Sequence, residues 1–285
     1  MAVWAAWLPA TRIAIADGLG PLDIALLRLA VPAALLAPVW WRTGLLPEGL
    51  PRPALLAMLG WGAPFVLLLT TGLRNASVAH TAALVPCTMP VVAALGARIV
   101  LGERIGRGRR AGIALIAMAA FLILAGVVAG DGRLDAATAA VLLCASAGWA
   151  AYTVAFRRSG LAPAQAAALV FAWSTLLLLP AALVADSGLW RLPAPSLAFH
   201  VVAQGLLSGF AATVAYGMAI ERLGVARAAS FSVLVPVLAT GLAWLWLSET
   251  PSALDAVALA LGTLGVAMVN GAIRIRPTVG RPPSA

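Results

Sequence analysis

The chain has 285 residues, of which 62% are hydrophobic and only 10% are charged, whereas a soluble domain carries about 25% charged residues. This composition excludes a water-soluble fold and predicts a polytopic membrane protein with the lipid bilayer as its surroundings. The formal net charge of +9 does not indicate nucleic-acid binding, because that function needs a contiguous basic face on a soluble module.

Charged residues, glycines and prolines divide the chain into ten apolar runs. Helices need about 20 residues to cross a bilayer, whereas membrane barrels use alternating strands of about 10 residues. The runs therefore predict an all-α bundle of ten transmembrane helices. In chain order we expect them at 1–17, 22–41, 53–73, 78–101, 111–129, 136–156, 164–184, 197–219, 228–248 and 254–272. The arginines and prolines of 274–285 predict a disordered tail.

The basic residues predict the orientation of the chain. All nineteen are arginines; thirteen lie in the tail or in connections on one side of the predicted bundle, and three lie in connections on the other side. Cytoplasmic loops of membrane proteins carry an excess of positive charge. Both termini are therefore expected in the cytoplasm.

The chain contains an internal repeat. A shift of 146 residues places Pro90–Glu103 on Pro236–Glu249, and a shift of 142 residues places Trp7 on Trp149. Five helices per half is an odd number, so the halves must have opposite orientations, and the arginine content of corresponding loops agrees. We predict two inverted five-helix repeats, 1–130 and 131–273, with substrate held between them near the membrane midplane.

Arg28 is predicted about 9 Å inside its helix, too deep for an easy reach to the membrane surface. One hypothesis is a structural ion pair with Asp17, Asp23 or a backbone carbonyl, and Arg12 would join these residues in one network at the outer mouth. The other hypothesis is a clamp for a substrate carboxylate. Loss of transport without loss of folding in Arg28→Ala would favour the clamp.

Glu103 and Glu249 end corresponding helices at opposite faces of the predicted bundle. Each either binds a neighbouring loop as an ordinary helix-end group or serves as a gate. Every acidic residue lies in a loop or near the end of a span, which argues against a proton relay through the membrane centre.

Aromatic residues inside spans, kinking prolines and nearby hydroxyl groups could line a substrate cavity. Core packing of the aromatic residues and repair of the kinks by the hydroxyl groups are the alternative interpretations. The candidates for the cavity, besides Arg28, are Trp61, Thr81, Pro90, Tyr152, Tyr216, Ser230 and Pro236. Prolines break helical hydrogen bonding and can expose carbonyl groups to a substrate. Six glycines predict close helix approach: Gly60, Gly62, Gly205, Gly209, Gly262 and Gly265.

No motif for enzyme chemistry is present. The sequence lacks a metalloprotease H-E-x-x-H, a G-x-S-x-G nucleophile elbow and a phosphate-binding P-loop. Its two histidines, His80 and His200, are too few for most metal sites and are expected to be solvated or hydrogen-bonded. We therefore expect neither catalysis, nor a cofactor, nor a metal.

Four strings carry a family resemblance: LLRLAV at 26–31, VPCTMPVVAALGARIVLGERI at 85–105, GWAAYTVAFRR at 148–158 and LGVARAASFSVLVPVLATGLAWLWLSET at 223–250. They resemble the EamA-type, ten-helix branch of the drug/metabolite transporter superfamily. The resemblance implies a secondary transporter in the bacterial inner membrane that moves small metabolites, such as amino acids or drugs, by alternating access. Export is the expected direction.

Two further interpretations remain open at this point. A non-transporting membrane scaffold or assembly protein is the alternative function, and it would show stability that does not depend on solute. Gly262 and Gly265 lie one turn apart on one helix face and are compatible with a homodimer.

Overall fold

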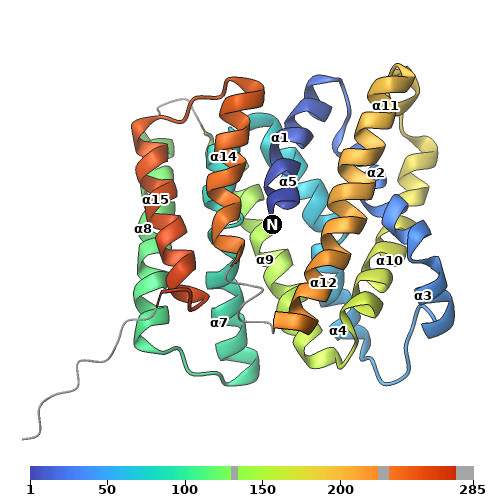
Figure 1. Cartoon of the computed structure of the whole chain (residues 1–285), viewed down its shortest axis with the longest axis horizontal. Coiled ribbons are helices and arrows are strands. Elements are labelled where there is room, and N and C mark those ends of the chain that lie inside the picture. Colours follow the sequence, from blue (N-terminus) through green and yellow to red (C-terminus); the bar gives the residue numbers. More distant parts are fainter. Residues whose placement is uncertain (130–133, 224–230, 274–285) are drawn as a thin grey trace, which may run out of the picture.

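The computed structural model describes residues 1–129, 134–223 and 231–273, and this part of the chain is built from helices without any strand (Figure 1). The predicted tail at 274–285 and Ser230 lie outside the described residues. The helices of the first half are α1 (Ala2–Ala16), α2 (Pro21–Leu35), α3 (Ala37–Thr43), α4 (Arg52–Met58), η1 (Leu59–Trp61), α5 (Ala63–Asn75), α6 (Val78–Leu84), α7 (Met89–Leu101) and α8 (Arg107–Ala129).

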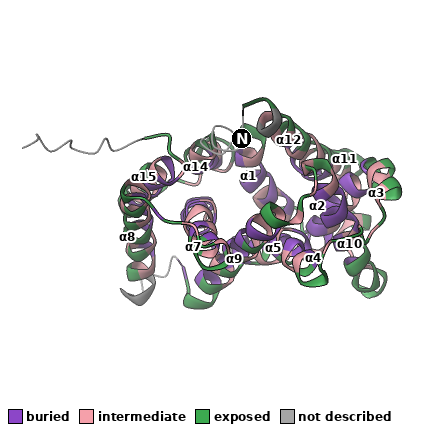
Figure 2. Ribbon diagram, turned by 90° about the horizontal axis from the view of Figure 1, so that it is seen from below, coloured by how far each residue is buried: buried purple, intermediate pink, exposed green. Residues whose placement is uncertain are grey.

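The second half continues the same pattern of long and interrupted helices. They are α9 (Ala136–Ser159), α10 (Pro163–Val184), η2 (Gly188–Arg191), α11 (Ala194–His200), η3 (Val201–Ala211), α12 (Ala212–Leu223), η4 (Phe231–Val233), α14 (Leu234–Leu247) and α15 (Ala253–Val269). Seen along the bundle, buried residues lie where helices face one another, and the outer sides of α3 and α8 are largely exposed (Figure 2).

The described helices include spans long and apolar enough to cross a membrane. Six helical runs qualify, and the number rises to seven if the bent pair α2–α3 is counted as one span. The six are Arg52–Asn75, Val78–Leu101, Arg107–Gly126, Ala136–Ser159, Pro163–Val184 and Ala194–Ala219. Shorter apolar helices occupy Ala2–Ala16, Phe231–Leu247 and Ala253–Val269. The exposed surface is itself apolar, with Ile99 82% and Leu183 84% exposed, as expected where lipid is the solvent.

Prolines lie at several of the interruptions. Pro38 is the second residue of α3, where α2 and α3 meet at 67°, because proline donates no backbone hydrogen bond and its ring crowds the preceding turn. Pro86 lies in the break between α6 and α7, and Pro90 is the second residue of α7. Pro236 lies in the first turn of α14, where its missing donor is least costly.

Glycines allow helices from the two halves to touch, as predicted. A Cβ atom on Gly60 would lie 2.5 Å from the carbonyl oxygen of Gly148 in α9. The packing of α8 against α15 is equally close, because a Cβ atom on Gly112 or on Gly265 would lie 2.7 Å from the carbonyl oxygen of the other residue. Contacts of this closeness leave no room for any side chain.

We expect Gly60→Ala to destabilise the protein by about 1–3 kcal/mol, because the added methyl group meets a helix backbone that cannot yield cheaply. Gly241→Ala is the matched control, since a Cβ atom there would have no heavy atom within 4 Å. Thermal unfolding of both variants in the same detergent tests this. Equal unfolding temperatures for the two variants would contradict the close packing.

Candidate functional site

Arg28 lies inside the bundle against Trp7 of α1 and Ser208 of η3. Arg28 is only 5% exposed. The guanidinium carbon is 3.6 Å from the centroid of the Trp7 ring, and Nη1 donates a hydrogen bond to the Ser208 hydroxyl oxygen. The cation thus rests on an aromatic face, which is favourable for a guanidinium removed from water.

A buried chain of hydrogen bonds continues from Trp7. Its Nε1 donates to Oε1 of Gln204 over 2.6 Å, and Nε2 of Gln204 donates to the Thr11 hydroxyl over 3.3 Å. Thr11 in turn donates to the Trp7 carbonyl over 2.7 Å. Trp7, Thr11, Arg28, Gln204 and Ser208 are buried, and together they form what we term the Arg28 cluster.

The backbone of η3 presents two members of this cluster. Val201–Ala211 is a π-helix, a rare form that is found mostly at functional sites. Gly209 lets η3 approach α2 closely, because a Cβ atom there would lie 2.6 Å from the Arg28 carbonyl oxygen. Tight helix contact and wide helical turns therefore direct Gln204 and Ser208 toward Trp7 and Arg28.

The predicted ion pair of Arg28 with Asp17 or Asp23 is wrong, and so is the outer network of these residues with Arg12. Asp17 follows the end of α1 and its carboxylate lies 2.8 Å from Nε2 of His200. Asp23 caps its own helix by accepting from the Gly20 amide over 3.0 Å, and it also accepts from the Ser187 hydroxyl. Within the described part of the chain, no carboxylate lies within 4.0 Å of the Arg28 guanidinium.

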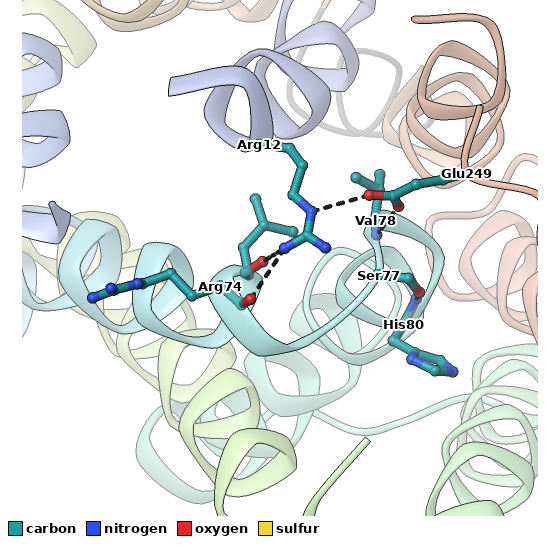
Figure 3. A network of polar contacts seen from close by, with 7 residues as sticks. Arg12, Arg74, Ser77, Val78, His80 and Glu249 are labelled. Carbon is teal, nitrogen blue, oxygen red and sulfur yellow. Dashed lines mark hydrogen bonds and ion pairs between the residues drawn. The ribbon is translucent and has the colours of Figure 1, made fainter. Parts of the chain in front are cut away.

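Glu249 connects helices at one end of the bundle (Figure 3). One carboxylate oxygen is 3.0 Å from Nε of Arg12, and the other accepts from the Val78 amide over 2.9 Å. Nη1 of Arg12 also donates to the Leu73 carbonyl oxygen over 2.6 Å. A single arginine and a single glutamate therefore connect α1, α5, α6 and the segment after α14.

Glu103 forms the corresponding contact with Arg157, at the end of α9. This pair is more open, with side chains 34% and 46% exposed. The hydrogen bond from Arg157 lowers the pKa of Glu103, and the positive charges of Arg157 and Arg109 act in the same direction. Because these interactions favour the ionised carboxylate, the ion pair persists at neutral pH and weakens only as acid protonates Glu103.

The two glutamates lie at opposite ends of the run Val78–Leu101. Glu249 accepts from the first amide of that run, and Glu103 follows its last residue by two positions. Twenty-four residues correspond to roughly 36 Å of helix at 1.5 Å per residue. Figure 1 agrees, because the chain leaves α14 at the upper end and leaves α7 at the lower end.

The structure places the aromatic candidates against other aromatic side chains. The rings of Trp61 and Tyr152 have centroids 4.7 Å apart, and Trp61 also contacts Phe171 at 5.6 Å. Tyr216 meets Trp4 edge to face at 5.2 Å. The first group lies on η1, α9 and α10, and its Trp61 and Phe171 pack in the same hydrophobic core as Trp7. Trp4 connects Tyr216 to the Arg28 cluster, because its Nε1 donates to the Ser208 carbonyl oxygen over 3.2 Å.

The remaining candidates are polar or structural. Thr81 is fully buried, and its hydroxyl has no hydrogen-bond partner among the described residues. His80 and His200 are both buried and each contacts an aspartate, which agrees with the predicted hydrogen-bonded role. No group of three histidine, cysteine or acidic side chains suited to a metal occurs in the ranges that the structure describes.

The sequence analysis did not identify Trp7 and Ser208 as partners of Arg28, or Gln204 as the partner of Trp7. Gln204 and Ser208 are four residues apart within an apolar run, so they fall on one helix face. A polar pair of this kind in a membrane helix could have indicated the buried polar cluster. Arg157 also went unnoticed, because its position at a helix end is typical of any cytoplasmic loop.

Comparisons with known proteins agree with this architecture. The chain matches the EamA-like transporter family over residues 1–125 and 137–271. It is 32% identical over 286 residues to a protein of Streptantibioticus cattleyicolor named "Probable terminal-alkyne amino-acid exporter", covering 98% of this chain and 91% of that protein. One crystal structure superposes with a TM-score of 0.61 at 22% identity, over 93% of this chain and 94% of that chain, which shows likeness of fold. The chain is therefore a membrane transporter of small metabolites and belongs to the EamA-like transporter family.

Proposed function

We propose that this protein is a secondary carrier that exports amino acids or similar carboxylated metabolites by alternating access, and that Arg28 binds the carboxylate of the solute. The observation that carries this proposal is a buried guanidinium without a counter-ion among the described residues. The description of the Streptantibioticus relative as an amino-acid exporter supports the choice of solute and direction.

The energetics of Arg28 favour this role over a structural one. An arginine at the centre of a membrane helix costs about 2.5–3.5 kcal/mol on insertion scales. The Trp7 face contributes up to about 2 kcal/mol, and one hydrogen bond to a charged group about 1.5–3 kcal/mol. These contacts can keep the cation in place, yet among the described residues they use only one face of the guanidinium and one of its hydrogen-bond donors. A carboxylate is the group that matches such a fork with two parallel hydrogen bonds.

We propose ten spans in two inverted halves. The seven candidate spans together with the three shorter apolar helices would supply that number. The ion pairs support the inversion, because each glutamate follows the fourth span of its own half and contacts an arginine in the first span of the other half. Helix packing has the same exchange, with α1 against α14 and α9 against α7.

We propose that these two ion pairs are the gates. Arg12–Glu249 would close one entrance and Arg157–Glu103 the other, so breaking them in turn would expose the solute to each side. With both termini in the cytoplasm of a bacterial cell, as the arginine distribution predicts, the Glu249 gate faces outward across the inner membrane.

A flux assay tests the function directly. Purified protein in liposomes should move radiolabelled amino acids, and we expect esters that lack the free carboxylate to be transported poorly. Protein-free liposomes give the background. Absence of flux for every amino acid and drug in a broad panel, with stability that no solute increases, would favour the scaffold alternative.

A further inference from the structure

A polar pocket of about 440 Å³ lies beside Glu249, between α6, α14 and the start of α15. This size is within the range of small-molecule sites. Its lining includes the polar residues Ser77, His80, Thr240, Glu249, Thr250, Ser252 and Asp255. The pocket is distinct from the Arg28 cluster, and none of the residues named for that cluster lines it.

The His80–Asp255 contact fixes the hydrogen-bonding character of one wall. Nε2 of His80 lies 2.9 Å from Oδ1 of Asp255, while the other carboxylate oxygen accepts from the Ser252 amide and hydroxyl over 2.9 and 2.8 Å. An ionised carboxylate only accepts, so we assign the imidazole proton to Nε2. In the neutral ring Nδ1 is then a hydrogen-bond acceptor.

Two buried polar atoms of the lining lack partners among the described residues. They are Nδ1 of His80 and Oγ1 of Thr240, in residues 6% and 5% exposed. Leaving such groups buried and unpaired costs about 1–3 kcal/mol each. An unsatisfied group in a residue that lines a pocket is a candidate partner for a ligand.

The charges of the lining define the ligand further. Glu249 and Asp255 contribute two carboxylates, while Arg12 supplies one neighbouring cation that is already paired with Glu249. Two of these three charges are negative, and the carboxylates accept hydrogen bonds. A primary ammonium group, with three donors and a positive charge, is complementary to this lining.

We propose that this pocket binds the ammonium group of the transported solute at the outer end of the carrier. The assignment of the solute rests on the proposed function, whereas the binding of a primary ammonium group does not.

Thermal unfolding of the full chain in detergent tests the pocket with n-propylammonium chloride as the probe. A ligand that binds only the folded state raises the unfolding temperature in a saturable manner. We expect n-propylammonium to raise the unfolding temperature in this way. Tetramethylammonium chloride and sodium chloride at equal ionic strength should bind at least about tenfold more weakly, because neither cation carries an N–H donor.

Thr240→Val should raise the apparent dissociation constant of n-propylammonium about tenfold, the loss expected for one hydrogen bond to a charged group. Thr263→Val is the matched control, because its hydroxyl is also buried without a partner among the described residues but does not line the pocket. Thr240→Ser should restore binding and keeps the test valid if Thr240→Val fails to fold.

An equal response to all three salts, or unchanged affinity in Thr240→Val, would overturn the ammonium site. Measuring both solute flux and amine binding on the same liposomes distinguishes failure of this proposal from failure of the proposed function. Flux without saturable amine binding overturns the pocket alone, and amine binding without flux overturns the carrier while the pocket stands.

Discussion

Arg28→Met should abolish most amino-acid transport while the protein still folds. Methionine fills much of the same volume and removes the group that we propose to bind the carboxylate. Loss of hydrogen bonds to a charged group, about 1.5–3 kcal/mol, corresponds to a fall of about 10- to 150-fold in solute affinity. Initial rates of uptake into proteoliposomes at low solute concentration measure this loss.

The stability of Arg28→Met distinguishes the carboxylate site from a structural role. Removing one member of a buried ion pair is strongly destabilising, because the other charge is left unpaired. No carboxylate lies near Arg28 in the described chain, so the unfolding temperature should stay within a few degrees of that of the parent protein. An aggregated or unfolded variant would favour the structural role.

Arg98→Met is the matched control for this experiment. Arg98 lies in the last turn of α7 and is exposed, so it can reach the membrane surface. Its replacement removes the same charge from a membrane helix without touching the Arg28 cluster. Transport should remain close to that of the parent protein.

Glu249→Gln and Glu103→Gln should shift the equilibrium between outward-open and inward-open conformations in opposite directions. Glutamine keeps the size and the acceptor oxygen but removes the charge that holds Arg12 or Arg157. Weakening the Glu249 contact should favour opening at that end, and weakening the Glu103 contact should favour opening at the other. Both variants should transport several-fold more slowly, since alternating access needs each gate to close in turn.

A buried cysteine can report on both gates. Ser146 on α9 is fully buried and bonded to the Thr88 hydroxyl at the break between α6 and α7. Ser146→Cys, in a chain whose Cys87 and Cys144 are replaced by alanine, should react faster with an impermeant thiol reagent from the outer side in Glu249→Gln. In Glu103→Gln it should react faster from the inner side. Faster labelling from the same side in both variants would contradict the two-gate mechanism.

The helical membrane architecture could be predicted from the sequence. In lipid every backbone polar group must be satisfied within its own segment, so length and hydropathy are sufficient to indicate helices such as Arg107–Gly126 and Pro163–Val184. Prolines and glycines act locally as well, which is why the helix break beside Pro90 and the close contact at Gly60 were predictable. The family strings and the repeated Pro-x12-Glu pattern also depend on sequence alone.

The partners of the charged residues could not be predicted in this way. Arg12 meets Glu249 across 237 positions, and Trp7 meets Gln204 across 197 positions. Such pairs depend on how each helix is rotated about its axis and on which neighbour its glycines admit. Asp17 and Asp23 are near Arg28 in sequence, yet helix rotation and capping direct both carboxylates elsewhere. Composition and spacing thus determined the membrane helices, while tertiary packing alone decided that Arg28 has an aromatic face and no counter-ion in the described chain.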